Sequence, residues 1–211
     1  MNRTDAISEV CRALSRNSSD TAIETLAANY PFAPKLLKKL HCTPLQSTRV
    51  FVRDGFIDRY SGEKLVFPPV FRLISLAIPK EFPFHPNWKT DVTHPAYWEI
   101  GATVDHHEAL SLGGPHNESN WYTTSMARNA AKMNWTLEQL GWRLHEPGDM
   151  DKWDGLLGWF LEYADAHPDI FHPDVLEIQS VKQWLSAAKR VTQSSTKPLS
   201  FTARQRRNGG Q

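Results

Sequence analysis

The chain has 211 residues, a formal net charge of +1 and 40% hydrophobic residues, among them eight Trp and ten Phe. This length and apolar content exclude a wholly disordered chain and predict one principal domain with its own core. No apolar run approaches the roughly 18 to 20 residues of a membrane span, and the first twenty residues lack the apolar stretch of a secretory signal. We therefore expect no membrane partner and a cytoplasmic location.

The charge is distributed unevenly along the chain. From Lys189 to Gln211 there are six basic residues and no acidic one, whereas ten acidic residues oppose two basic ones between Trp135 and Ile178. A polyanion would be repelled by the acidic segment and attracted by the basic one. We expect residues 191–211 to be a basic, disordered tail, with a merely solubilising tail as the alternative reading.

The first half of the chain combines helical patterns with one alternating pattern. Apolar residues at helical spacing predict two short helices before Tyr30, in an N-terminal helical segment of residues 1–47. Residues 47–62, STRVFVRDGFIDRYSG, alternate apolar and polar residues around Asp54-Gly55, which predicts a β-hairpin. Pro68 to Ala77 predicts a short helix, with a buried strand as the alternative, and a long loop should follow from Pro79 to Pro95.

Residues 98–135 should form a strand, a loop, a second strand and a helix. Trp98 to Val104 alternate as a strand with one buried face, which would end in Asp105 and His106. Gly113-Gly114 predicts a turn-rich connection, and Trp121 to Thr123 a return strand. A helix beginning near Ser125 would place Asn129 and Lys132 on one face, because they are three residues apart.

The C-terminal part is expected to be a helical extension over residues 136–190. Thr136 to Gln139 is a capping-box pattern whose helix should end before Pro147. Apolar stripes from Trp153 to Ala164 and from Val175 to Ala188 predict two more helices that pack into a core.

The residue types gathered after the first of these strands suit phosphodiester hydrolysis. That reaction needs a base for water and a cation that neutralises charge on the phosphoryl oxygens. A neutral imidazole such as His106 is a base near pH 7. Carboxylate and amide oxygens, which Asp105 and Asn129 offer, suit a hard ion such as Mg²⁺. The strand and the following helix could hold one ion between them.

The stretch VDHHEALSLGGPHNESNWYTTSMARNAAKMNW resembles the HNH endonuclease motif. His106 is followed by Asn120 and Asn129 at offsets of 120 − 106 = 14 and 129 − 106 = 23, as in the Asp-His branch of that family. The resemblance implies an α+β fold in which a ββα-metal finger, within a nuclease core of residues 48–135, is embedded between the N-terminal helices with the hairpin and the C-terminal helices.

The resemblance also implies roles for individual residues. His106 would be the general base, Asp105 and Asn129 would bind one divalent ion, Mg²⁺ or Mn²⁺, and Asn120 would hold the loop that carries the base. Lys132 and Arg128 are candidate nucleic-acid contacts. Relatives with adjacent histidines leave His107 as the alternative base, although the preceding aspartate and the two offsets favour His106.

Many HNH proteins brace the finger with zinc on two Cys-x-x-Cys pairs. The matching positions here are Asp58 and Ser61, then Ser125 and Arg128. Because arginine cannot ligate a cation and serine is a poor zinc ligand, we expect no structural zinc and assign the bracing to apolar packing.

The expected activity is that of a metal-dependent endonuclease acting on DNA, with RNA as the alternative substrate and a homodimer left open. A non-catalytic nucleic-acid-binding protein and a nuclease toxin remain alternative readings. The letters Asp-His-His also occur in the DHH phosphoesterases, but no Asp-x-Asp motif precedes Asp105.

Overall fold

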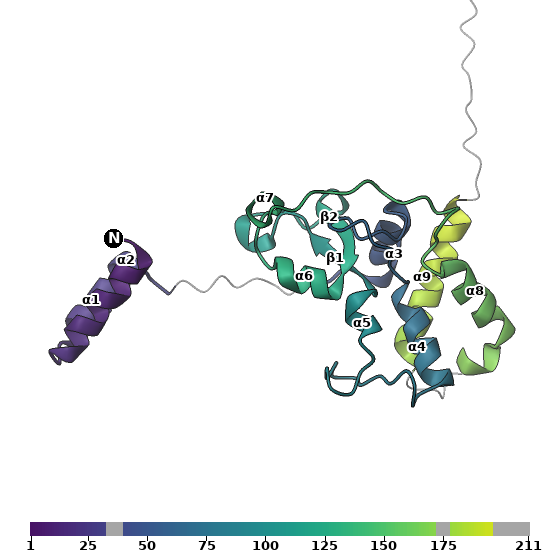
Figure 1. Ribbon diagram of the computed structural model, residues 1–211, viewed down its shortest axis with the longest axis horizontal. Helices are drawn as coiled ribbons and strands as arrows, with labels where there is room; N and C mark the ends of the chain where they lie inside the picture. Colours follow the sequence, from purple (N-terminus) through teal and green to yellow (C-terminus); the bar gives the residue numbers. More distant parts are fainter. Residues whose placement is uncertain (33–39, 172–177, 196–211) are drawn as a thin grey trace, which may run out of the picture. The chain divides into compact units, whose positions relative to one another are not determined.

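The computed structural model describes residues 1–32, 40–171 and 178–195. The chain divides into two compact units, Met1–Lys38 and Lys39–Gln211. The regular elements of the described residues are helices and one two-stranded antiparallel sheet, so the fold class is α+β as expected (Figure 1). None of the described helices is both long and apolar enough to cross a membrane.

The first unit is a pair of helices, α1 (Arg3–Ser15) and α2 (Ser19–Asn29), which confirms the two short helices expected there. Asn2 caps α1, and its side-chain oxygen accepts a hydrogen bond from Asp5 N at 2.8 Å. The residues buried between the two helices are small: Ala6, Ala13 and Ala22.

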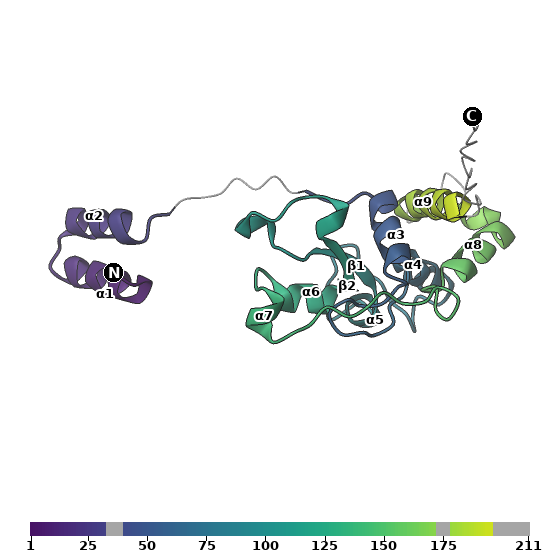
Figure 2. The same cartoon turned by 90° about the horizontal axis from the view of Figure 1, so that it is seen from above.

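The second unit surrounds the sheet with helices. In the sheet, β1 pairs with β2 from Ala102↔Ser125 to His106↔Trp121. Helix α3 contacts both strands and α9, whereas α6 contacts both strands and α5 (Figures 1 and 2). The elements are α3 (Pro44–Arg53), α4 (Pro68–Ala77), α5 (Ala96–Glu99), β1 (Ala102–His106), β2 (Trp121–Ser125), α6 (Met126–Lys132), α7 (Leu137–Leu140), α8 (Leu157–Ala166) and α9 (Gln179–Ser195).

The β-hairpin expected over residues 47–62 is wrong. Helix α3 occupies the first half of that segment, opened by a capping box between Thr43 and Gln46 and by Pro44 at its first turn. The apolar residues that suggested a strand bury one helical face, and beyond the turn at Asp54-Gly55 only an isolated bridge, Ile57↔Lys64, forms. The capping signal, which lies before the alternating stretch, decided the local structure.

The first strand of the sheet begins later than expected. Residues Ala96–Glu99 form the short helix α5 after Pro95, so Trp98 is helical and β1 begins at Ala102. A Cβ on Gly101 would lie 2.6 Å from Tyr97 O, so glycine is required for the strand to leave the helix so closely.

The remaining expectations are largely confirmed. Helix α4, the loop after it, β2, α6 and α7 lie where the sequence predicts them, and α8 begins four residues after Trp153. Helix α9 continues through Ser195, so the first residues of the expected disordered tail are helical. The rest of the tail, residues 196–211, and the predicted start of the last helix at Val175 lie outside the described residues.

The core of the second unit is aromatic. Phe67 lies edge-on to Phe160 and Trp184, with ring centroids 5.3 and 5.5 Å apart, and Phe51 stacks on Trp184 at 6.2 Å. These rings bring α3, α8 and α9 together, so the C-terminal helices belong to the same core as the sheet.

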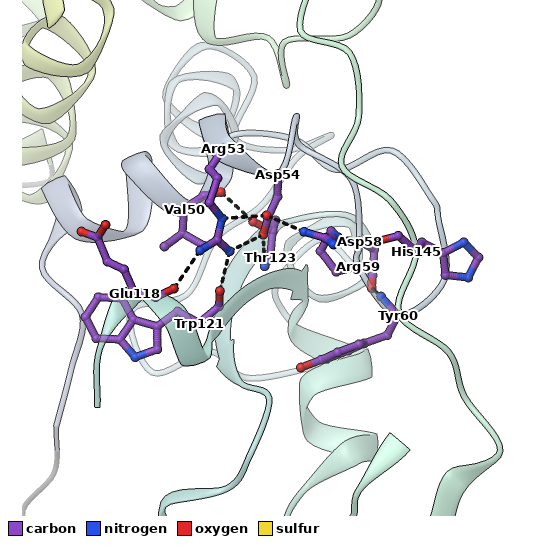
Figure 3. Close-up of polar contacts among 10 residues, drawn as sticks. All are labelled: Val50, Arg53, Asp54, Asp58, Arg59, Tyr60, Glu118, Trp121, Thr123 and His145. Carbon is purple, nitrogen blue, oxygen red and sulfur yellow. Dashed lines mark hydrogen bonds and ion pairs between the residues drawn. The ribbon is translucent and has the colours of Figure 1, made fainter. Parts of the chain in front are cut away.

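Asp54, which is fully buried, joins the end of α3 to β2 (Figure 3). Its carboxylate accepts hydrogen bonds from Arg59 Nη1 at 2.7 Å, Arg53 Nε at 2.9 Å and Thr123 N at 2.8 Å. Arg53 also donates to the carbonyl oxygens of Glu118 and Trp121. The start of β2 is therefore held by charge-assisted hydrogen bonds from the turn after α3.

Replacing Asp54 by Ala should strongly destabilise the second unit. The substitution leaves the buried Arg59 guanidinium without its carboxylate, and breaking a buried pair in this way typically costs about 3–5 kcal/mol. Denaturant unfolding followed by far-UV circular dichroism measures the change. Asp165→Ala, which breaks the exposed ion pair with Lys189, is the matched control and should unfold near the wild-type midpoint. Equal midpoints for the two variants would contradict this role of Asp54.

Candidate functional site

Helix α6 lies against the end of β1 and brings the expected site residues together. Ser125 caps the helix by accepting a hydrogen bond from Arg128 N at 3.2 Å. Asn129 and Lys132 share the face toward the sheet: Asn129 Nδ2 donates to Val104 O at 3.4 Å and Lys132 Nζ to His106 O at 2.9 Å. Two residues of the helix thus contact the strand on either side of Asp105.

Asp105 is buried and one of its oxygens has two partners. Lys132 Nζ lies 2.9 Å from Asp105 Oδ2, and the Tyr60 hydroxyl donates to the same oxygen at 2.8 Å. Burial and then the Asp105 carboxylate raise the pKa of Tyr60, so its hydroxyl stays protonated and remains a donor. Lys132 is fully buried, and its ammonium faces Asp105 rather than solvent.

His106 lies on the opposite face of β1, at the start of β2. Trp121 Nε1 donates to His106 Nε2 at 3.1 Å, and His116 Nδ1 lies 2.9 Å from the same nitrogen. Because an indole N–H can only donate, Nε2 is an acceptor and the neutral ring carries its proton on Nδ1. Burial, and then His116, lower the pKa of His106, so the ring is neutral at pH 7.

Asn120 fastens the loop between the two strands. Its Oδ1 accepts from Glu108 N at 2.9 Å, while its Nδ2 donates to Glu108 O and Pro115 O, each at 2.9 Å. A Cβ on Gly114 would lie 2.0 Å from Glu108 O, so only glycine permits this closure. The buried amide therefore ties both ends of the loop that begins directly after His106.

His107 starts that loop and is less engaged than His106. Its backbone N–H donates to Asn120 O at 2.9 Å, and its ring lies edge-on to Tyr122. Its Nδ1 is buried and makes no hydrogen bond to any described residue. Burial, and then the ammonium of Lys132, lower the pKa of His107, so this ring is also neutral at pH 7.

Arg128 belongs to a second polar cluster. This cluster contains the four positions that match the zinc-binding cysteines of the HNH pattern: Asp58, Ser61, Ser125 and Arg128. Asp58, fully buried, accepts from Ser125 N at 3.0 Å and lies 3.4 Å from Arg128 Nε. Arg128 Nη2 lies 3.4 Å from Glu63 Oε2, and Ser61 Oγ donates to that oxygen at 3.2 Å. An ion-pair cluster, rather than the apolar packing expected there, joins the four positions.

The oxygen donors near the end of β1 suit a hard divalent ion with few protein ligands. Within the described ranges, no three His, Cys, Asp or Glu side chains gather as a metal site. Tyr60 and Lys132 both contact Asp105 at Oδ2, so Oδ1 is the carboxylate oxygen that we consider for an ion. Since Asn129 directs its Nδ2 toward Val104 O, its Oδ1 points elsewhere. One carboxylate and one amide oxygen fit Mg²⁺, which usually keeps several waters.

Comparisons with known proteins add no relative. No family model, no curated protein and no solved structure matches the chain. The site must therefore be interpreted from its own geometry.

Two residues of the site were missed from the sequence. Tyr60 is 45 positions from its partner Asp105, and no local pattern connects them. His116 had no assigned role, although it precedes Asn120 in the same loop. Only its position ten residues after His106, across a Gly-Gly-Pro turn, could have suggested that the two rings meet.

Removing one partner of the Asp105–Lys132 pair should cost more stability than removing both. Lys132→Met leaves the carboxylate buried without its cation, and Asp105→Asn leaves the ammonium without its anion, each costing about 3–5 kcal/mol. The double variant should regain much of that loss. A double-mutant cycle from chemical denaturation measures the coupling, and additive losses would contradict the pairing.

Chelation should leave the stability of the protein unchanged. Because Asp58, Ser125, Arg128 and Glu63 form an ion-pair cluster at these positions, we expect no stoichiometric zinc in the purified protein and the same melting temperature with and without EDTA. Elemental analysis and differential scanning calorimetry provide the two readings. One zinc per chain, together with a melting temperature lowered by EDTA, would refute the expectation.

Proposed function

We propose that this protein is a metal-dependent endonuclease that hydrolyses DNA phosphodiester bonds with an HNH-like ββα finger made of β1, β2 and α6. The contact of α6 with the end of β1 carries the proposal. Asn129 and Lys132 contact β1 at Val104, Asp105 and His106. The helix that carries Asn129 therefore lies beside the strand that carries Asp105 and His106. The spacing of the motif in the sequence is independent support.

His106 is the proposed general base. Its Nε2 holds the lone pair, since Trp121 donates to it, and the ring is neutral at pH 7. The attacking water would give its proton to this nitrogen, taking the place beside it that His116 holds in the structure. The Trp121 N–H shares this lone pair in the structure, so it would have to release Nε2 before the proton is transferred.

Asp105 and Asn129 are the proposed ligands of one divalent ion, magnesium or manganese. When bound, the ion would supply positive charge to the phosphoryl oxygens and to the departing 3′ oxygen. Lys132 and Tyr60 hold the Asp105 carboxylate through Oδ2 and so direct Oδ1 away from themselves. The resemblance to HNH enzymes implies products with 5′-phosphate and 3′-hydroxyl ends.

Asn120 would position the base, because it ties the loop that follows His106 at Glu108 and Pro115. Lys132 is fully buried against Asp105, so it does not contact a nucleic acid in this structure, and Arg128 would have to leave Asp58 to do so. Arg49 on α3 also lies near a carboxylate, 3.8 Å from Glu118 Oε1, but its side chain is 55% exposed and therefore more accessible to a backbone phosphate.

Substituting His106 by Ala should lower the rate of cleavage about 10²- to 10⁴-fold, because general-base catalysis contributes this much. Purified wild type and variant are incubated with supercoiled plasmid in Mg²⁺, Mn²⁺ or EDTA, and nicked and linear products are quantified. The matched control is His167→Ala, because the His167 ring stacks on Tyr163 at the end of α8 and has no assigned role in cleavage. This variant should cut like wild type.

Full activity of folded His106→Ala would reject His106 as the base, and His107→Ala then tests the alternative. If neither wild type nor variants cut DNA or RNA, yet all bind DNA, the non-catalytic binding protein is the better reading. Activity that persists in EDTA would contradict the metal requirement.

A further inference from the structure

A cavity of about 950 Å³ lies within the second unit, and neither Asp105 nor His106 is among the described residues that line it. It is bounded by α3, α4, α9, β1 and the loop of residues 79–95 that follows α4. Its volume falls within the range of small-molecule sites. Aromatic rings dominate the walls: Phe51, Phe71, Phe84, Trp88, Tyr97 and Trp184.

Three polar side chains of the lining, Arg72, Ser75 and Tyr97, lie together. Among the described residues that line it, Arg72 is the only charged side chain. The Arg72 guanidinium lies 3.6 Å from the centre of the Phe84 ring and hydrogen-bonds to Tyr97. The Tyr97 hydroxyl is 2.8 Å from Ser75 Oγ, and both of these residues are buried. One cation and two hydroxyls thus form a polar cluster in a cavity whose lining is mostly apolar.

We propose that this cavity binds an aromatic or similarly apolar small molecule that carries one acidic group. The rings would cover the apolar body of the ligand, whose transfer from water is favourable. The acidic group would lie at Arg72, because a guanidinium can donate to several acceptors at once and a buried anion is tolerated only when it is paired. None of the described residues that line the cavity is a carboxylate that would repel such an anion.

The cavity shares two elements with the proposed nuclease site. Ala102, Thr103 and Val104 of β1 line it, and so does Met126, the first residue of α6. These elements carry Asp105 and Asn129 a few residues further along. The binding proposal itself does not depend on nuclease activity.

The test compares an acid with its uncharged counterpart on the full chain. Isothermal titration calorimetry with 2-naphthoate should show one site per chain, and 2-naphthalenemethanol should bind about tenfold or more weakly, the usual worth of a charged hydrogen bond. Arg72→Leu should remove the preference by weakening the acid alone. Arg143→Leu, at an exposed arginine outside the lining, is the matched control and should bind both probes like wild type.

A third variant tests the place of binding without touching Arg72. Ser180 is an exposed residue of α9 on the cavity wall, so Ser180→Trp should fill the opening and weaken both probes. Far-UV circular dichroism and melting temperatures establish that each variant is folded. The proposal is overturned if wild type binds neither probe, if it binds acid and alcohol equally, or if folded Ser180→Trp binds both like wild type.

Discussion

Buried carboxylates hold the two-stranded sheet in place. Two strands of five residues cannot cover their own faces or stand alone in water, so the sheet depends on the elements around it. Asp54 and Asp58 accept backbone N–H groups of β2, whereas Asp105 in β1 binds the ammonium of Lys132. A carboxylate can be buried only with a cation and hydrogen bonds around it, so these contacts constrain where α3 and α6 lie.

The same constraint shapes the candidate site. Lys132 neutralises Asp105 from the inside of the protein, and Tyr60 adds a second donor to the same oxygen. A divalent ion at Asp105 would therefore join a carboxylate whose charge is already partly balanced, which favours an ion held by few protein ligands and by substrate oxygens. Lys132 therefore fixes the position of the Asp105 carboxylate, whichever substrate the site binds.

The polar cluster of Asp58 and Arg128 has a comparable role in joining segments far apart in the chain. It connects the turn after α3 with the start of α6, 67 residues from Asp58 to Ser125. Ion pairs of this kind are directional, because each partner must also satisfy its remaining donors and acceptors. They hold the α6 start beside β2, where apolar side chains of the same length would specify the position less closely.

The sequence alone determined the local features with short-range causes. Capping at Ser125 and Thr136, the proline-opened helix α4 and the return strand at Trp121 could all be predicted from neighbouring residues. The spacing of the motif likewise predicted that Asn129 would return to the strand carrying Asp105. The alternation in residues 47–62 led to the wrong prediction of a hairpin, because a short apolar pattern is compatible with both a strand and a helix.

Only the tertiary structure decided which charges are buried and with whom. Nothing near Lys132 in the sequence indicates that it is enclosed, and nothing near Asp105 points to Tyr60. The pairing of His106 with His116, and the chamber around Arg72, likewise arise from segments that meet after folding. Burial and pairing depend on the packing of the whole unit, whereas capping and turn formation depend on a few adjacent residues.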